Sequence, residues 1–325
     1  MSAGGAVDVA AAILERPDGR VLLARRPEGK AYAGFWEFPG GKFEPGEDTG
    51  QALGRELEEE LGIRVKIAYP WVTRVFAYPH ATVRLHFHRV VDWTGEPFGR
   101  ERQMLSWQRL DALDIAPLLP ANQPIVHALR LPLECGVSAA AGMGGAPFLR
   151  ALEGALAGGL RLIQVREPGL DRDRLERLTR EVASRARDHG ARVILNGDVE
   201  LAHALGLDGV HLPARMLATL TARPDFPYCG ASAHDREEMA RAAALKLDYV
   251  VLGPVRETAT HPGQAGLGWE RFADLARECP MPVYAIGGLG HGDLVRARTA
   301  GAHGVAMLRG AWANAAAGAR AEKSP

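Results

Sequence analysis

Three glutamates that follow a glycine-rich loop are the residues of this 325-residue chain best placed to do chemistry. Glu56, Glu59 and Glu60 have the spacing i, i+3 and i+4, which places them side by side on a helix. Like charges at this spacing repel one another, so a cation should neutralise them. Carboxylate oxygens suit Mg²⁺ or Mn²⁺, which keep positions open for water and phosphate oxygens. The pattern predicts a divalent cation held against a diphosphate; the alternative is a solvated acidic helix face.

The sequence around these acids predicts the helix that positions them. Asp48 is the expected N-cap, and Gln51 can return the hydrogen bond of a capping box. The helix should run over residues 49–61, and Gly62 should end it in the left-handed conformation. The acids then lie beside an apolar stripe, which consists of Leu53, Leu57 and Leu61.

The loop before the helix should bring the backbone close to the metal and the phosphates. Gly40 and Gly41 allow this close approach because they have no side chain. Arg55 can fix the loop by pairing with Glu47.

Residues 41–63 match every specified position of the Nudix box: Gly, five residues, Glu, seven residues, and then Arg-Glu-aliphatic-x-Glu-Glu-x-Gly-aliphatic. The sequence outside the box resembles the MutT type of this family, the 8-oxo-dGTP diphosphatases. The resemblance covers almost all of residues 6–130. The segments that carry it are residues 23–26, 36–42, 95–101 and 120–124.

The resemblance implies that water attacks a nucleoside triphosphate between its α and β phosphates. Glu56, Glu59 and Glu60, with the carbonyl of Gly40, would hold the metal ions, Mg²⁺ or alternatively Mn²⁺. Glu101 falls where the MutT type places a further acid, which serves as ligand or base; the alternative is an exposed loop acid.

Base recognition needs groups that read the edge of an oxidised guanine. Oxidation at C8 turns N7 into a donor, so the pocket needs an acceptor there and a donor for O6. Asn122 can supply both, although a backbone carbonyl could share this role and the asparagine could instead cap a helix. Phe38 is expected either on the purine face or in the core, and Arg26 either at phosphate and sugar oxygens or in a surface pair. The predicted substrate-binding residues are Arg26, Glu37, Phe38, Pro39, Gly40 and Asn122.

Periodicity divides the chain into two predicted domains, residues 1–131 and 132–325. In the first, residues 7–14 and 20–24 look like a strand pair around Pro17-Asp18-Gly19, and residues 81–92 form a long alternating strand. The second alternates short apolar strands with helices, as a (β/α)₈ barrel does. Its expected strands are residues 133–138, 160–165, 192–195, 209–212, 228–231, 249–252, 283–286 and 304–307. The predicted fold class is an α+β Nudix fold followed by an α/β TIM-type barrel.

The second domain resembles the thiamin phosphate synthase and TenI superfamily over about residues 133–312. The matching segments are residues 164–167, 196–197, 209–212, 232–234, 248–254 and 285–288. Most follow expected strands, where a barrel builds its site. Gly287 and Gly288 can offer backbone N–H groups to a phosphate, or they only make a tight turn. The implied site residues are Arg166, Asn196, His234, Gly287 and Gly288.

The barrel departs from a synthase at four positions. A synthase would carry two metal-binding acids and two diphosphate-binding lysines, and this chain has none of them there. The positions hold Pro168, Gly197, Met216 and His261. The coupling reaction is therefore not expected. The TenI branch, the thiazole tautomerases, uses a histidine at the position of His234; the barrel is thus a tautomerase or a non-catalytic phosphate-binding module.

Composition narrows the partners. The chain carries 39 basic and 39 acidic residues, so nothing suggests electrostatic binding of nucleic acid. Three widely spaced cysteines suit a reducing cytoplasm, and no apolar run approaches the length that spans a membrane. We expect a cytoplasmic hydrolase.

The expected reaction is the hydrolysis of 8-oxo-dGTP to 8-oxo-dGMP and diphosphate, which removes a mutagenic nucleotide from the pool. The alternative is a Nudix hydrolase of thiamin-pathway diphosphates. The expected small molecules are a nucleoside triphosphate in the first domain and a phosphorylated thiazole or pyrimidine in the barrel.

Overall fold

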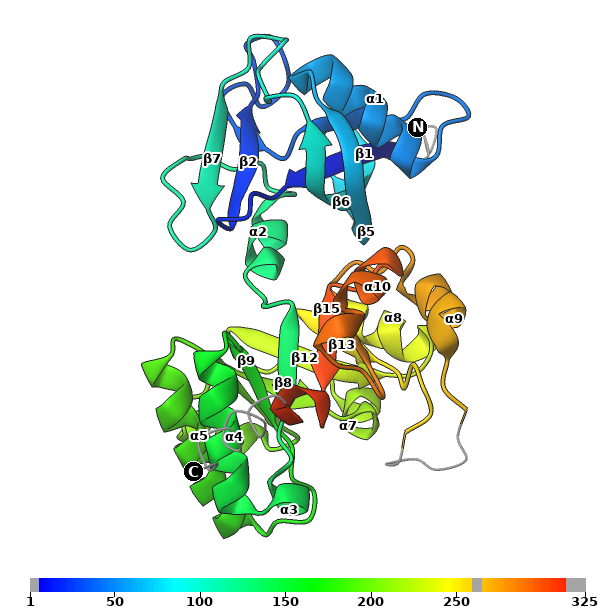
Figure 1. Cartoon of the computed structure of the whole chain (residues 1–325). Helices are drawn as coiled ribbons and strands as arrows, with labels where there is room; N and C mark the ends of the chain where they lie inside the picture. Colours follow the sequence, from blue (N-terminus) through cyan, green and yellow to red (C-terminus); the bar gives the residue numbers. More distant parts are fainter. Residues whose placement is uncertain (1–5, 259–264, 314–325) are drawn as a thin grey trace. The chain divides into compact units, whose positions relative to one another are not determined.

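The computed structural model of the chain describes residues 6–258 and 265–313 (Figure 1). These residues form two compact units, one built mainly from residues before Pro132 and the other mainly from residues after it.

The first unit is an α+β fold with two β-sheets. Its strands are β1 (Val7–Leu14), β2 (Arg20–Arg25), β3 (Trp36–Glu37), β4 (Gly40–Lys42), β5 (Arg64–Ala77), β6 (Thr82–Thr94) and β7 (Leu105–Arg109), and its helices are α1 (Thr49–Leu61) and α2 (Gln123–Leu129). One sheet has the order β4-β1-β6-β5 and the other has the order β3-β2-β7. Strand β1 runs parallel to β6 and antiparallel to β4.

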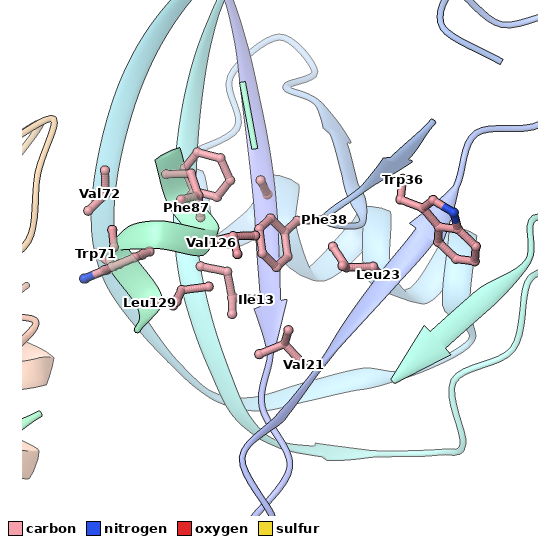
Figure 2. Packing of buried hydrophobic residues seen from close by; sticks show 13 residues of the cluster. Ile13, Val21, Leu23, Trp36, Phe38, Trp71, Val72, Phe87, Val126 and Leu129 are labelled. Carbon is pink, nitrogen blue, oxygen red and sulfur yellow. The ribbon is translucent and has the colours of Figure 1, made fainter. Parts of the chain in front are cut away.

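Strand β1 lies between two hydrophobic clusters. Ala10, Ala12 and Leu14 pack with the buried leucines of α1. Ala11 and Ile13 face the other cluster, which includes residues of α2 and the rings of Trp36, Phe38, Trp71 and Phe87 (Figure 2). Successive side chains of a strand point to opposite faces, so a strand buried on both faces must be apolar throughout. This packing holds β4, and with it the glycine loop, against the edge of a rigid strand.

Helix α1 has the boundaries that the sequence predicted. The Asp48 carboxylate accepts hydrogen bonds from the backbone N–H of Gly50 at 2.8 Å and of Gln51 at 2.9 Å. The Gln51 side chain accepts one from the Asp48 N–H at 2.9 Å, which completes the capping box. Gly62 ends the helix with φ 69°. The predicted leucine stripe is buried, since it contains Leu53, Leu57 and Leu61.

The predicted hairpin of residues 7–14 and 20–24 is wrong as a pair, although both strands exist. Strand β1 pairs with β4 and β6, whereas β2 pairs with β3 and β7, and only a bridge between Glu15 and Val21 joins the two segments. The chain crosses from one sheet to the other at this turn. The predicted strand 81–92 is confirmed as β6. Its partner β5 was not predicted, because Pro70 and three register shifts interrupt its alternation.

The second unit is a closed barrel of parallel strands, as predicted. The strands are β8 (Glu134–Val137), β9 (Leu162–Val165), β10 (Arg192–Asn196), β11 (Gly209–Leu212), β12 (Tyr228–Ala233), β13 (Tyr249–Leu252), β14 (Val283–Ile286) and β15 (Gly304–Met307). Each lies within about two residues of a predicted strand, which is the usual uncertainty of element boundaries. Because all strands run the same way, their C-terminal ends meet at one face.

The helices of the barrel follow its strands, and some are short. They are α3 (Ala140–Met143), α4 (Gly145–Ala157), α5 (Arg172–Asp188), α6 (Val199–Ala204), α7 (Ala214–Thr219), α8 (Arg236–Ala244), α9 (Gly268–Ala276) and α10 (Leu294–Thr299), with 3₁₀ turns η1 (His291–Asp293) and η2 (Gly310–Trp312). Within the described part of the chain, no helix combines the length and apolarity needed to cross a bilayer.

The capping box gives a stability prediction. Asp48→Ala removes the acceptor for two N–H groups at the start of α1, so the free energy of unfolding of the first unit should fall by about 1 kcal/mol. Asp111→Ala is the matched control, since Asp111 is an exposed acid that pairs with Arg109 two residues earlier and caps no helix. Denaturant unfolding measures both variants. Equal stability of the two variants would contradict the role assigned to the cap.

Candidate active site and barrel cavity

The glycine loop lies in close contact with the acids of α1. A Cβ on Gly40, which has φ +142°, would lie 2.0 Å from the carbonyl oxygen of Ala10. A Cβ on Gly41 would lie 2.1 Å from the carboxyl carbon of Glu56. The Gly40 N–H donates to the Glu60 carboxylate at 3.3 Å. Only glycine fits at position 40, where the clash is with backbone, and a side chain at position 41 would displace the Glu56 carboxylate. The loop and two of the predicted acids therefore form one site.

Arg55 holds the loop and the helix together. Its Nε and Nη2 donate to the two carboxylate oxygens of Glu47 at 2.7 and 3.0 Å, as the sequence predicted. Its Nη1 donates to Glu56 at 3.0 Å and to Glu59 at 3.1 Å. The guanidinium hydrogen bonds lower the pKa of Glu47 to about 2. The side chain of Glu59 is 61% exposed and lies at the outer edge of this network.

Glu60 carries the most perturbed carboxylate of the site. Burial raises its pKa first, and the charges of Glu101 and Glu56 raise it further, to about 7. Burial also raises the pKa of Glu56, against the lowering effect of Arg55. The site therefore gathers more negative charge than the neighbouring arginine neutralises.

The predicted substrate residues Arg26 and Glu37 form a pair. The Nη1 of Arg26 lies 2.7 and 2.6 Å from the two carboxylate oxygens of Glu37. Burial raises the pKa of Glu37, and Arg26 opposes this rise. Both side chains are about one-quarter exposed, at 23% and 26%, so a ligand can reach the pair.

The structure places the Phe38 ring in the core. Phe38 is 4% exposed and meets Phe87 edge to face at 6.1 Å between ring centroids (Figure 2). The expectation that this ring packs on a purine is therefore wrong. Strand alternation explains the placement, because Glu37 faces the site and the next side chain must point inward. The carbonyl of Pro39 already accepts a backbone hydrogen bond, from the Ala12 N–H at 2.8 Å.

Asn122 is buried and stands at the N-cap position of α2, but it does not cap the helix. Its side chain makes no capping hydrogen bond, and Asn122 is 5% exposed. Within the described residues, its amide has no hydrogen-bond partner. The amide is not among the fully buried side-chain groups that lack a partner, so it keeps access to water or a ligand.

An aromatic side chain near Glu37 and Asn122 was not predicted from the sequence. Tyr78 packs on Tyr32 at 5.3 Å and stacks on His80 at 5.6 Å between ring centroids. Burial, then the charge of Glu37, raises the pKa of Tyr78, and a backbone hydrogen bond at Ala121 lowers it. Tyr78 thus lies near both Glu37 and the residue before Asn122. The run Tyr78-Pro79-His80 at a strand end was the available signal.

The ion pair between Glu101 and Lys30 was also not predicted from the sequence. The Lys30 ammonium lies 2.5 Å from the Glu101 carboxylate, and the two side chains are 47% and 46% exposed. Glu101 is an exposed loop acid in position, yet its charge is the largest electrostatic contribution to the raised pKa of Glu60. The geometry shows an exposed loop acid close to Glu60, and a role of Glu101 as ligand or base stays a prediction.

The barrel contains a cavity of about 470 Å³ at the C-terminal ends of its strands. Its lining includes four of the five predicted barrel residues, which are Arg166, His234, Gly287 and Gly288. Asn196 is not among the lining residues. His234 is 56% exposed, and its Nδ1 lies 2.9 Å from the Glu238 carboxylate, which orients the ring.

His211 is a cavity residue to which the sequence gave no role. Its Nε2 lies 2.9 Å from the hydroxyl of Ser232, and its Nδ1 lies 3.3 Å from the hydroxyl of Tyr249. Burial, with the nearby charge of Arg166, lowers its pKa to about 3, so the ring is neutral at physiological pH. The Gly-Val-His-Leu strand was the signal, because alternation points this side chain into the barrel.

The positions of the missing synthase acids lie together. A Cβ on Gly197, which has φ +81°, would lie 3.9 Å from the sulfur of Met216. Neither residue offers an oxygen ligand from its side chain. Glu167 cannot replace them, since its carboxylate accepts the N–H groups of Ala140 and Ala141 at 2.7 and 2.9 Å. Pro168 is exposed, and His261 lies outside the described residues.

Known protein families match the two units separately. The NUDIX domain family matches residues 10–128. The Thiamine monophosphate synthase family matches residues 137–311, more than half of the chain. The chain belongs to both families. Its Nudix domain and its synthase-like barrel are thus joined in one polypeptide.

Relatives of the Nudix domain carry two different substrate names. The 8-oxo-dGTP diphosphatase of Haemophilus influenzae is 43% identical over 123 residues, which are 38% of this chain and 90% of that protein. The CTP pyrophosphohydrolase of Escherichia coli is 41% identical over 122 residues, again 38% of this chain and 90% of that protein. Similarity alone therefore does not choose between a purine and a pyrimidine nucleotide.

The synthase-like barrel has relatives of similar identity. The thiamine-phosphate synthase of Chromobacterium violaceum is 41% identical over 160 residues, which are 48% of this chain and 77% of that protein. The barrel nevertheless differs from a synthase at the positions described above, so its activity is a separate question.

Nudix hydrolases use divalent metal cations, and the residues of this site fit one. Among the described residues, no three His, Cys, Asp or Glu side chains already lie close enough to hold a metal ion, because Glu59 turns to Arg55 and Glu101 to Lys30. The Gly40 backbone and the carboxylates of Glu56 and Glu60 still offer hard oxygen donors. Burial, and after it the charges of Glu101 and Glu56, raise the pKa of Glu60, and a bound cation would oppose this rise by favouring the ionised carboxylate.

The raised pKa of Glu60 should make the stability of the metal-free first unit depend on pH, and a divalent cation should abolish this dependence. Its native pKa of about 7 lies above the ordinary 4.5, so without metal the folded state loses stability as pH rises through this window. We expect Glu60→Gln to melt at a higher temperature than the unmodified chain at about pH 8 in chelator, and the difference should vanish below the unfolded pKa of 4.5, at about pH 4. Excess Mg²⁺ should reverse the order at the higher pH. Identical melting of the two proteins at the higher pH in chelator would contradict the buried charge.

Proposed function

We propose that the Nudix domain hydrolyses 8-oxo-dGTP to 8-oxo-dGMP and diphosphate and so removes a mutagenic nucleotide from the pool. The amide of Asn122 carries the assignment, because it caps no helix and is free to hydrogen-bond to a base edge. The relatives include both an 8-oxo-dGTP diphosphatase and a CTP pyrophosphohydrolase, so the choice of base rests on Asn122.

We propose Mg²⁺ as the cation, with Mn²⁺ as the alternative. Glu56, Glu60 and the Gly40 carbonyl would hold it, and Glu59 would join them after leaving Arg55. When bound, the cation neutralises the diphosphate and lowers the pKa of water. Glu101 is half exposed on its loop, where its carboxylate can serve as a ligand or accept a proton from the attacking water.

Asn122 and its neighbours give the pocket its proposed selectivity. The amide oxygen of Asn122 accepts the N7–H that exists only in the oxidised base, and the amide nitrogen donates to O6. Tyr78 offers an aromatic face for the base, a role first considered for Phe38. The pair of Arg26 and Glu37 lies nearby and offers polar contacts to the nucleotide. Unmodified dGTP presents an acceptor at N7, so the Asn122 oxygen would meet a lone pair and stay unsatisfied.

We propose that the barrel binds a phosphorylated thiazole or pyrimidine and does not couple the two. The N–H groups at Gly287 and Gly288 border the cavity, and the guanidinium groups of Arg166 and Arg309 lie in its lining. The pair His234 and Glu238 supports a tautomerase as the catalytic version of this proposal, because Glu238 fixes the imidazole orientation. The other version is a phosphate-binding module without catalysis. A thiamin-pathway diphosphate is the corresponding alternative substrate for the Nudix domain.

The nucleotide assignment predicts a preference that depends on Asn122. The kcat/KM for 8-oxo-dGTP should exceed that for dGTP, and Asn122→Ala should lower this ratio by at least about tenfold, because it removes two hydrogen bonds to the base. Steady-state hydrolysis of both nucleotides, with CTP and thiamin diphosphate as further substrates, measures the ratio. Glu60→Gln is the control for the site and should lose at least about a hundredfold in turnover.

Equal kcat/KM for 8-oxo-dGTP and dGTP in the unmodified protein would remove the nucleotide-sanitising proposal and leave Nudix hydrolysis standing. Faster hydrolysis of thiamin diphosphate would favour the alternative substrate.

The barrel proposal predicts a failure of complementation. The full chain should not restore growth without thiamin to a bacterial strain that lacks its thiamin phosphate synthase, since Gly197 and Met216 cannot hold the cation of the diphosphate. The same chain with an inactivating Glu60→Gln substitution excludes interference from the Nudix domain. Growth of either strain without thiamin would overturn the proposal.

A further inference from the structure

A short loop carries Lys30 to the edge of the acidic site. Residues 26–35 join β2 to β3, and the loop closes on itself, since the Arg26 N–H donates to the Phe35 carbonyl at 2.8 Å and the Gly34 N–H to the Arg26 carbonyl at 2.9 Å. The carbonyl of Lys30 accepts the Ala33 N–H at 3.1 Å. The backbone at Lys30 is therefore fixed, and the four-carbon side chain alone sets where the ammonium lies.

The partner of Lys30 belongs to the active site. Glu101 follows Arg100, whose N–H donates to the Glu60 carbonyl at the end of α1 at 3.0 Å. Gln103 ties the same segment to α1, because its amide donates to the Glu60 carbonyl at 3.2 Å and accepts the Glu101 N–H at 2.8 Å. The ammonium that reaches Glu101 thus stands beside the acids that face a nucleotide diphosphate.

The three cations near these acids differ in how firmly they are held. Arg55 donates to three carboxylates and a carbonyl and is 21% exposed. Arg26 donates to both carboxylate oxygens of Glu37 and to the Ala31 carbonyl, and is 23% exposed. Lys30 forms one ion pair within the described part of the chain and is 47% exposed. An exposed single pair contributes little stability, so Lys30 can leave its partner at small cost.

We propose that Lys30 is a substrate-binding residue that pairs with Glu101 in the free protein and moves to the terminal phosphate groups when a metal-bound nucleoside triphosphate enters. The inference rests on the proposed nucleotide hydrolysis and adds the residue that recognises the triphosphate tail. A polyphosphate supplies several anionic oxygens where Glu101 supplies one contact, and an ammonium group binds phosphate as a mobile point charge. The exchange frees the Glu101 carboxylate for the reacting water or the cation.

The test compares Lys30→Met with Lys66→Met as a matched control. Lys66 is another exposed lysine of the same unit, 53% exposed, with a weak contact of 4.0 Å to Asp92. Binding to the full-length protein is measured by calorimetry with the uncleavable α,β-methylene analogue of dGTP, in Ca²⁺, and with dGMP. Lys30→Met should lower the affinity for the triphosphate analogue at least about tenfold and change the affinity for dGMP by less than about twofold. Lys66→Met should change neither affinity.

A Glu101→Gln background separates phosphate binding from a structural role of the ion pair. If Lys30 binds phosphate, Lys30→Met still lowers the affinity for the analogue about tenfold in this background. If the ion pair only fixes Glu101, Lys30→Met has no effect on this affinity once Glu101 is replaced. Lys30→Arg should keep most of the affinity. Unchanged binding of the analogue, equal losses for the analogue and dGMP, or loss of the effect with Glu101→Gln would each overturn the inference. Since the analogue carries no oxidised base, these outcomes do not depend on the 8-oxo preference.

Discussion

The close contact between the glycine loop and the carboxylates of α1 is the constraint on which the first domain depends. Gly40 leaves no room for a Cβ because the Ala10 backbone lies against it, and a Cβ on Gly41 would push the Glu56 carboxylate out of place. The contact requires β4 to lie against β1, and β1 is held in turn by apolar side chains on both faces. Two hydrophobic clusters therefore serve to bring backbone N–H and carbonyl groups within reach of acids that would otherwise be solvated.

This contact also explains why the negative charge of the site is only partly neutralised by the protein. Carboxylates packed against backbone lose water, and several of them share one small region, so ionisation of Glu60 becomes costly. Arg55 neutralises part of the charge but is committed to Glu47, which fixes the loop. The remaining deficit of positive charge is what a divalent cation and a mobile lysine are suited to supply. Stability of the free protein and affinity for its ligands are therefore opposed at the same residues.

Sequence reasoning succeeded where local rules decide the outcome. The limits of α1 follow from Asp48, Gln51 and Gly62, and the barrel strands follow from short apolar runs, so both were predicted closely. It failed where distant segments decide. The partner of β1 and the pair of Lys30 with Glu101 depend on which strand or loop arrives from elsewhere in the chain, as does the choice between the two expectations for Phe38. No role for His211 could be predicted, because its two hydroxyl partners come from strands β12 and β13.

The two domains use opposite electrostatic means for what we propose to be related ligands. The Nudix site collects carboxylates and so needs a cation before it can approach a phosphate. The barrel cavity, as far as its described lining shows, contains Arg166, Arg309 and glycine N–H groups and no carboxylate. A phosphate can enter such a cavity without a metal ion, since fixed guanidinium groups and backbone donors already oppose its charge. Gly197 and Met216 offer no carboxylate for the cation of a diphosphate, whereas the proposed monophosphate would need none. Metal dependence should therefore distinguish the ligands of the two domains, whichever chemistry the barrel performs.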